Sequence, residues 1–534
     1  MYKKIFTPAF LCLITIVSTA QNCAPASAFD FLDINNVKAR INNGGDMWWD
    51  LIQNAQYLVP KNGNASSLFA GALWIGGIDA NGQLRVAAQT YRQTGNDFFP
   101  GPLDTNGNTS QMICQNFDRI WKVNKSAIDS FIQGMYTMIP PSILEWPGRG
   151  NLNLSFMPDQ DLAPFIDIDG DGIYNPGNGD YPQIPGDQAL WFVFNDMGNE
   201  HSQTHGEPLG LEVQCMAYAV HDSASSLNNA TFYNYKLLYK GSFDLDSTFV
   251  GIWLDPSLGC GDDDNIGCDS LRSLGFVYNA YPHDGGCSSS YGDNPPILAI
   301  DILQGPADEN QIVHSLDYCM SYQNDFSELG NPTEPIHYYN YLHSIFKDGA
   351  HLTYGGYGYN GSTSSNYYFS GDPSNLNGWS QCGGFGWNWD SKMILSSGPF
   401  TIHPNEVKMF DIAVIWNDSA VYPCPSFSQI ADQATTAENY FKQLNFQTTT
   451  CNTLHASHPV NVVPNPVAQS GNIGFTASCA EKIIVYDCSG KILLERKIQG
   501  ESMSQLSTKG WSKSIYLYKV IFADGEVNGK FIVQ

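Results

Sequence analysis

Closely spaced turn signals are the feature that most constrains the fold of this 534-residue chain. Asn-Gly, the dipeptide most typical of tight turns between strands, recurs along it, and short runs rich in β-branched and aromatic residues lie between the turns. Examples are Asn62-Gly63, Asn81-Gly82, Asn106-Gly107, Asn360-Gly361 and Asn528-Gly529. In residues 232–239 the large apolar side chains alternate, which places Tyr233, Tyr235, Leu237 and Tyr239 on one face of a strand. The fold class is therefore predicted to be mainly β.

Two segments, 114–134 and about 427–446, break this pattern with the apolar spacing of amphipathic helices. We expect a β-rich, multi-lobed body with a few short helices, closed by the second of these segments. A polar run after it predicts a linker into a separate terminal unit. The predicted units are 21–205 and 206–447 in the body, a linker at 448–459 and a C-terminal unit at 460–534.

The N-terminal segment has the features of a secretory signal peptide. Lys3 and Lys4 precede an apolar run over 5–17 and small residues at 18–20, which a signal peptidase accepts. We therefore predict that residues 1–20 are removed. The apolar run is too short to span a bilayer and no later run is longer, so no membrane-spanning segment is expected.

A series of motifs in a fixed order closes the chain. They are Pro464-Asn465-Pro466, the hairpin Tyr486-Asp487 to Gly490-Lys491, the pair Tyr516 and Tyr518 in one strand, and the basic-apolar terminus 530–534. This series resembles the C-terminal sorting domain of type IX secretion substrates (the Por secretion tail), a small immunoglobulin-like β-sandwich of two-membrane bacteria. One departure is Ser514, where the family commonly has Gly.

The resemblance implies a route and a partner. It implies Sec-dependent export, recognition by the type IX secretion machinery, removal of this domain, and release or attachment at the bacterial outer cell surface. Parts of the body, at 43–102, 253–278 and 398–401, are also similar to large uncharacterised cargo proteins of the same system. That second similarity implies no activity.

The charge is concentrated in the body. The chain has 52 acidic and 26 basic residues and a net charge of −26, of which 21–459 carries −30 and 460–534 carries +2. There is no Lys/Arg-rich run, so the sequence offers no cationic surface for nucleic acid or for anionic lipid.

Carboxylates at alternate positions of a glycine-rich loop predict a calcium site. Asp167, Asp169 and Asp171 stand at positions 1, 3 and 5, before a glycine at position 6 and a backbone carbonyl at position 7, so that oxygens can surround one cation. Three like charges so close together are unfavourable without a cation. This favours structural Ca²⁺ over a solvated Asp/Gly turn.

The loop resembles the calcium loops of EF-hands and thrombospondin repeats as far as Asn175. It then departs from them, because position 12 is Asn178 rather than Glu and no flanking helices are evident; Asp180 is available to supply the missing carboxylate. The predicted metal ligands are Asp167, Asp169, Asp171, the carbonyl of Ile173, Asn175 and Asp180.

A second acidic cluster lacks regular ligand spacing. It consists of Asp255, Asp262, Asp263, Asp264 and Asp269. A second calcium site and a plain acidic loop both remain open. Because an exported protein permits disulfides, Cys260 and Cys268, which lie in this irregular segment, are free to pair.

Enzyme signatures are poor. Metalloprotease, nucleophile-elbow, phosphate-loop and dinucleotide motifs are missing from the sequence. Glu200, His201, His205 and Glu207 come nearest to a metal-ligand set, but nearby glycines and a proline predict a loop with incidental surface histidines. Whether the chain is an enzyme is left open, with the balance against it.

Aromatic residues are the remaining resource, with 12 Trp, 28 Tyr and 29 Phe. Exposed, pairs such as Trp48-Trp49 and Trp387 with Trp389 would stack on sugars; buried, they fill sandwich cores, which we favour. The overall prediction is a secreted or cell-surface protein with a calcium-stabilised body that acts in binding, adhesion or structure, with a surface glycan or extracellular polymer as the possible partner. The alternative is an extracellular hydrolase acting on a glycan or other polymer.

Overall fold

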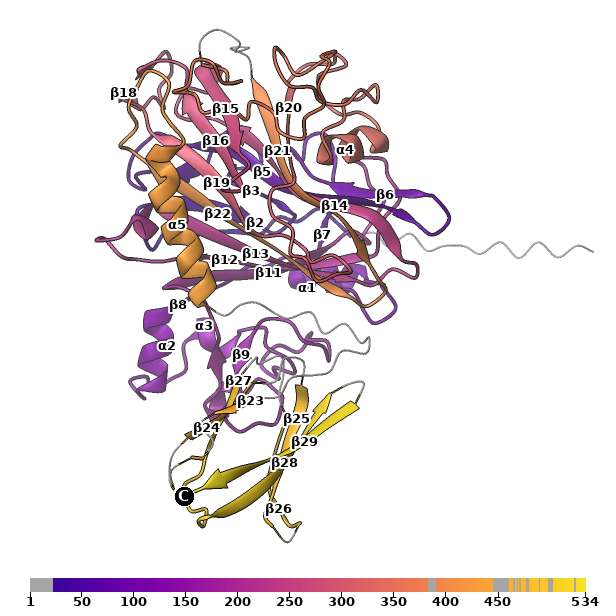
Figure 1. Ribbon diagram of the computed structural model, residues 1–534, viewed down its shortest axis with the longest axis vertical. Coiled ribbons are helices and arrows are strands. Elements are labelled where there is room, and N and C mark those ends of the chain that lie inside the picture. The colour runs from indigo at the N-terminus through magenta and orange to yellow at the C-terminus, as the bar shows by residue number, and fades with distance from the viewer. Residues whose placement is uncertain are drawn as a thin grey trace, which may run out of the picture.

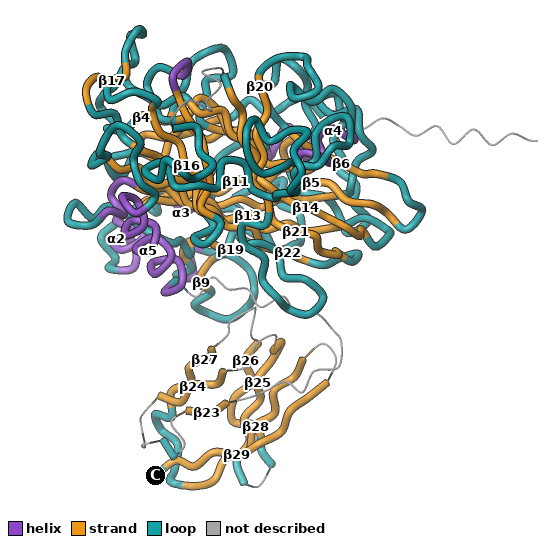
Figure 2. Tube along the Cα trace, turned by 45° about the horizontal axis from the view of Figure 1, so that its top comes forward, coloured by secondary structure: helices purple, strands orange, loops and turns teal. Residues whose placement is uncertain are grey.

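The computed structural model describes residues 23–382 and 390–444 throughout, and 461–534 except 464–465, 468, 470–471, 477–479, 489, 498–502 and 523–524. The predicted signal peptide, the predicted linker and Trp387 and Trp389 lie outside the described residues. Two large sheets form the body and two small sheets form the C-terminal unit (Figures 1 and 2). The chain is mainly β, as predicted.

Sheet 1 is antiparallel and draws its strands from both halves of the body. Its strands, in spatial order, are β1 (Phe29–Leu32), β2 (Lys38–Asn42), β3 (Asp46–Met47), β5 (Leu68–Asp79), β14 (Leu245–Pro256), β21 (Ser391–Ile402) and β20 (Tyr318–Gln323), with β4 (Tyr57–Leu58) beside β2 and β6 (Leu84–Ala88) beside β5.

Sheet 2 is also antiparallel. Its strands, in spatial order, are β15 (Asp264–Asp269), β16 (Leu274–Asn279), β19 (Ile297–Gln304), β22 (Val407–Asn417), β13 (Ala230–Tyr239), β12 (Leu211–Ala219), β11 (Gln188–Asn195) and β7 (Phe99–Pro100), with β8 (Trp121–Asn124) beside β11. The predicted boundary at residue 206 falls between β11 and β12, which pair with each other. Short pairs outside these sheets are β9 (Phe165–Ile166) with β10 (Tyr181–Pro182) and β17 (His283–Asp284) with β18 (Gly292–Asp293).

The main core lies between the two sheets. The alternation predicted for β13 is confirmed, because Tyr233, Tyr235, Leu237 and Tyr239 are all buried in this core. Trp48 also inserts into it and donates from Nε1 to the Tyr233 hydroxyl at 2.8 Å. A Cβ at Gly71 would lie 2.3 Å from the Trp48 ring, so the close approach of this indole to β5 requires glycine there.

A helix covers the outer face of each sheet (Figure 1). Helix α4 (Pro335–Leu342) packs on sheet 1, where Tyr338 meets Trp74 edge to face with ring centroids 5.0 Å apart. Helix α5 (Ser428–Gln443) forms where the sequence predicts a helix, and packs on sheet 2 through buried side chains spaced three or four residues apart: Ile430, Ala434, Ala437 and Phe441. Among the described residues, no helix has the length and apolar character to cross a membrane.

The helix predicted over 114–134 is wrong in its middle. The segment forms α1 (Gln111–Phe117), then strand β8, then α2 (Lys125–Ile132). Because β8 pairs with β11, placing Trp121 opposite Trp191, sheet pairing overrides the local helical spacing. The short helix α3 (Pro141–Leu144) and the 3₁₀ turns η1 (Pro176–Asn178), η2 (Ser226–Asn229) and η3 (Gly261–Asp263) complete the body.

The C-terminal unit is a two-sheet sandwich with its own core. One sheet contains β23 (Asn461–Val463), β24 (Asn472–Thr476) and β27 (Met503–Ser507); the other contains β26 (Ile492–Lys497), β25 (Ala480–Tyr486), β28 (Ser514–Phe522) and β29 (Gly525–Val533). Tyr516, Tyr518 and Phe531 are buried together in its core. The hairpin motif has a physical reason: Gly490 takes a φ of +87° and Asp487 accepts from the Lys491 amide at 3.0 Å.

The Asp411 carboxyl group is buried on the outer face of sheet 2. Asp411 of β22 lies opposite Asn234 of β13, whose side-chain amide donates to it at 2.6 Å. Burial raises the pKa of Asp411 to about 7, against 3.8 ordinarily, although this hydrogen bond acts to lower it. The folded state therefore holds this proton between about pH 4 and 7 while the unfolded state releases it, so stability falls as pH rises through that window.

Asp411→Asn is expected to stabilise the protein above pH 7, because a neutral amide keeps an oxygen for Asn234 and removes the buried charge. One pKa unit corresponds to about 1.4 kcal/mol, so the gain at pH 8 is at most about 4 kcal/mol and vanishes near pH 4. Urea unfolding at several pH values measures it, with the exposed Asp432→Asn as control. A variant less stable than wild type at pH 8 would contradict this account.

Candidate functional site

A pocket of about 500 Å³ lies on the outer face of sheet 1, at the end of β14. Asp255 in its wall follows Trp253 by two residues and so shares its face of the strand. Trp253 stacks on Trp74 with ring planes 3° apart, and Trp74 contacts Tyr338 of α4, so this is the face that α4 partly covers.

Three aromatic rings form one side of the pocket. Trp49, Phe69 and Tyr91 contact one another, with ring centroids 5.8 to 6.5 Å apart. Trp49 donates from Nε1 to Asp46 at 2.8 Å, which fixes its indole. Phe69 and Tyr91 are half-buried, so part of each ring faces the pocket.

Charged groups form the base of the pocket. The buried Lys392 ammonium lies 2.7 Å from Asp255 Oδ1 and also pairs with Asp390, while the Tyr91 hydroxyl donates to Asp255 Oδ2. Asn324 donates to Asp390 at 2.6 Å. One ammonium therefore bridges two carboxylates.

These contacts shift the pKa values of Asp255 and Asp390 in opposite directions. Burial raises the pKa of Asp255 and outweighs Lys392, which acts to lower it. Burial also acts to raise the pKa of Asp390, but there the charge and hydrogen bond of Lys392, with the bond from Asn324, prevail and lower it. Burial and the neighbouring Asp255 raise the pKa of the Tyr91 hydroxyl, which stays protonated.

The carboxylate loop brings together three of its predicted ligands. One oxygen each from Asp167, Asp169 and Asp180 lies within 4.8 Å of the other two. Asp180 is buried and accepts from the amides of Ile168 and Asn175, both at 2.8 Å. Burial raises the pKa of Asp180, and the charges of Asp167 and Asp169 add to that effect.

Of the predicted carboxylate ligands, Asp171 lies in the same loop but outside that group, and the loop also contains Ile173 and Asn175. Asp171 accepts from the amide of Ile173 at 2.7 Å, and Asn175 caps η1 by accepting from Gly177 at 3.0 Å. Asp167 accepts from the amides of Gly170 and Gly172 at 2.7 and 2.8 Å. The backbone thus holds the first carboxylate in a fixed orientation.

The second acidic cluster is spread over several environments. Asp255 binds Lys392, Asp264 accepts from the Leu258 amide at 2.7 Å, and Asp269 pairs with Arg272. Asp262 is exposed at the rim of the pocket, and Asp263 is half-buried beside it. The structure therefore does not gather these five carboxylates around one point.

Cys260 and Cys268, whose pairing the sequence left open, do not pair with each other. Cys260 bonds to Cys287, while Cys268 is a free thiol in β15, inside the core between the sheets. The strand begins at Asp264, between the two cysteines, and carries Cys268 away from the loop. Two further disulfides are Cys23–Cys114 and Cys382–Cys424.

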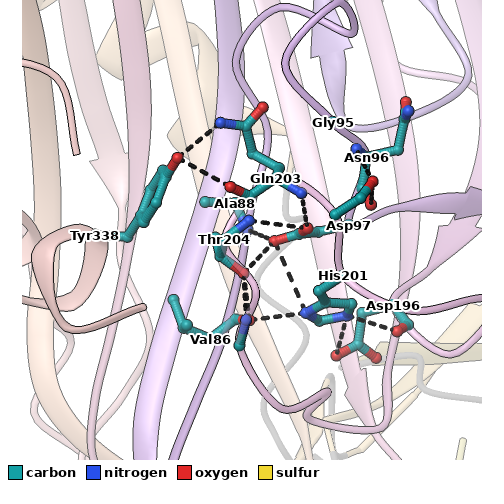
Figure 3. Close-up of polar contacts among 12 residues, drawn as sticks. Val86, Ala88, Gly95, Asn96, Asp97, Asp196, His201, Gln203, Thr204 and Tyr338 are labelled. Atoms are coloured by element: carbon teal, nitrogen blue, oxygen red, sulfur yellow. Dashed lines mark hydrogen bonds and ion pairs between the residues drawn. The ribbon is translucent and has the colours of Figure 1, made fainter. Parts of the chain in front are cut away.

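His201 is buried, not an incidental surface residue. Its Nδ1 lies 2.9 Å from the Val86 carbonyl and its Nε2 lies 2.8 Å from the Asp196 carbonyl (Figure 3). These contacts occupy both ring nitrogens, so neither is free to bind a metal. The carboxyl groups of Asp97 and Asp196 lie 3.7 and 3.8 Å from the ring, so the imidazole sits between two buried acidic residues. Burial raises the pKa of Asp196, and His201 acts to lower it. We call Asp97, Asp196 and His201 the clasp.

Sequence reasoning missed most of the pocket. Phe69 and Tyr91 are about 300 residues away from Asp390 and Lys392 in the chain, and no motif joins the two pairs. One signal was available: Lys392 is the one charged residue in the strand 391–402, and a charge in a buried strand needs a partner.

Comparison with known proteins identifies the family of the C-terminal unit but not that of the body. Residues 461–534 match the family described as the secretion system C-terminal sorting domain. The C-terminal unit is thus a type IX sorting domain and the chain is a type IX secretion substrate. No curated protein matches the chain.

One similar solved structure is a polysaccharide lyase with 7% identity and a TM-score of 0.20. The match covers 61% of this chain and 34% of that one, so this chain spans about a third of the length of the lyase. A likeness this weak carries no argument about the body.

His201→Ala is expected to destabilise the body by about 2–6 kcal/mol, since it leaves the buried carbonyls of Val86 and Asp196 without the ring nitrogens that bind them, at about 1–3 kcal/mol for each buried group left unpaired. Chemical unfolding at pH 7 measures the loss. His221→Ala, which truncates an exposed histidine, is the matched control and should change stability little. Equal stability of the two variants would show that the clasp does not stabilise the body.

Proposed function

We propose that this protein acts outside the cell as a binding or adhesion module whose body is stabilised by Ca²⁺. The sorting domain supports the location, because it indicates export and surface attachment. The single observation that carries the calcium proposal is the group of Asp167, Asp169 and Asp180 oxygens within 4.8 Å of one another.

The chemistry of this group suits a hard cation. Ca²⁺ takes six to eight oxygen ligands from carboxylates, carbonyls and water. Asp167 and Asp180 are already oriented by backbone amides, so binding costs little ordering of side chains. A cation here would relieve the repulsion that helps to raise the pKa of Asp180.

A second candidate function is hydrolysis of an extracellular glycan or other polymer. It is favoured by the pocket, which holds two carboxyl groups with opposite pKa shifts, as glycoside hydrolysis requires. Both groups, however, are bound by Lys392, so neither is free to attack or to protonate a substrate. This arrangement supports binding over hydrolysis.

Millimolar calcium is expected to raise the melting temperature of the body relative to EDTA. Binding of one ion at a concentration a hundredfold above Kd stabilises by about 2.7 kcal/mol. Asp167→Asn and Asp180→Asn should abolish the increment, whereas Asp222→Asn, at an exposed carboxylate outside the loop, should keep it. Identical melting in calcium and EDTA would reject the calcium proposal.

Deletion of residues 461–534 is expected to leave the protein in the periplasm of a bacterium with an active type IX system. The reciprocal construction should behave in the opposite way, since residues 448–534 placed on a periplasmic reporter should carry it outside the cell. Fractionation and immunoblotting measure both. Normal appearance of the truncated protein in the medium would contradict the assignment of the sorting signal.

A further inference from the structure

The pocket at the end of β14 has a lining that suits one class of ligand. We propose that it binds a neutral sugar residue of an extracellular glycan. This inference rests on the proposed binding function and names the ligand class for it. Its volume of about 500 Å³ lies within the range of small-ligand sites.

The aromatic side supplies a rigid platform. The half-buried Phe69 and Tyr91 present part of their rings to the pocket, and the buried Trp49 packs against both and supports them. Tyr91 also packs edge to face on Trp253, with ring centroids 5.2 Å apart. A sugar ring has an apolar face of C–H groups that can pack on such rings, which are apolar bodies with polar edges. Because the rings are already ordered, binding costs little side-chain entropy.

A sugar also needs hydrogen-bond partners for its hydroxyl groups, and polar side chains at the rim of the pocket supply them. Gln53, Gln93 and Asn324 are exposed amides on the pocket, each with donors and an acceptor. Gln93 donates to the Ile52 carbonyl at 3.0 Å, which joins the two loops on that side. Sugar hydroxyl groups both donate and accept hydrogen bonds, as neutral amides do. Such amides therefore complement a hydroxyl group better than they complement an ionic group.

The charge of the lining excludes anionic sugars. Asp255, Asp262 and Asp390 line the pocket, and none of the described lining residues is Lys or Arg. Lys392, behind the lining, is bound to Asp255 and Asp390, which leaves the exposed Asp262 as the remaining carboxylate of the lining. A uronate, sulfate or phosphate group would meet net negative charge, whereas a neutral hydroxyl can donate to Asp262 by a charge-assisted bond.

Hydrogen bonds to residues near it hold the loop that carries Tyr91, Gln93 and Thr94 in place. Gln89 donates to the Gly95 carbonyl at 2.8 Å, and Thr90 donates to Gln203 at 3.1 Å. Gln203 in turn donates to the Tyr338 hydroxyl at 2.7 Å (Figure 3). The wall of the pocket is therefore organised before any ligand arrives.

The test is affinity electrophoresis of the purified chain in native gels that contain one soluble polysaccharide each. The neutral set is galactomannan, xyloglucan, hydroxyethylcellulose and laminarin, and the acidic probe is polygalacturonate. Wild type is expected to be retarded by at least one neutral polymer and not by polygalacturonate. Phe69→Ala should weaken binding at least tenfold, Asp262→Asn severalfold, and Phe243→Ala, at an exposed ring outside the pocket lining, should not change it.

Three results would overturn the inference: no retardation by any neutral polymer, retardation by polygalacturonate, or neutral binding that survives both pocket variants. Asp262→Asn changes an exposed side chain, so it keeps the test valid if Phe69→Ala does not fold. Calcium-dependent melting is recorded on the same samples. If calcium raises the melting temperature but no neutral polysaccharide binds, only the proposed ligand class is wrong. If calcium does not raise the melting temperature, the proposal of a calcium-stabilised body is wrong.

Discussion

The clasp of Asp97, Asp196 and His201 is the interaction on which the geometry of the body depends most directly. It links an edge of sheet 1 to sheet 2, because His201 binds the Val86 carbonyl of β6 while Asp196, just after β11, accepts from the amides of Gly210 and Leu211 at the start of β12. A buried cluster of hydrogen-bonded polar groups is costly to break, since each group left behind loses its partner in a medium of low polarity. The clasp therefore fixes the relative position of the two sheets at this edge.

The same cluster organises the pocket. Asp97 accepts from the Ala88 amide at 3.1 Å and from the Thr204 hydroxyl at 2.6 Å, so it closes the loop between β6 and β7 against the segment around Gln203. That loop carries Tyr91 in the aromatic wall. The buried clasp and the aromatic wall of the pocket are therefore connected by hydrogen bonds, and weakening the clasp should loosen the wall.

Local patterns predicted those features that depend on neighbours in sequence. The alternation in β13, the helix at α5, the hairpin at Asp487 and the position of the carboxylate loop follow from periods, turns and spacing within about twenty residues. The clasp, the pocket and the Cys260–Cys287 bond could not be predicted, because they join residues that only the sheet order brings together. The segment 114–134 shows the same limit, since its apolar spacing is helical but β11 recruits its middle as a strand.

The high negative charge of the body is the physical basis of the calcium proposal. In a body with net charge −30 several carboxylates lie close together, and at the pocket the chain supplies a compensating cation itself, because Lys392 lies between Asp255 and Asp390. At Asp167, Asp169 and Asp180 the described hydrogen bonds come from backbone amides and from Asn178, not from a basic side chain. Dipoles offset such charge less well than a cation does. Among the described hydrogen bonds of this group no basic side chain balances the negative charge, and its oxygens are the ligands that Ca²⁺ takes, which is why we propose calcium there.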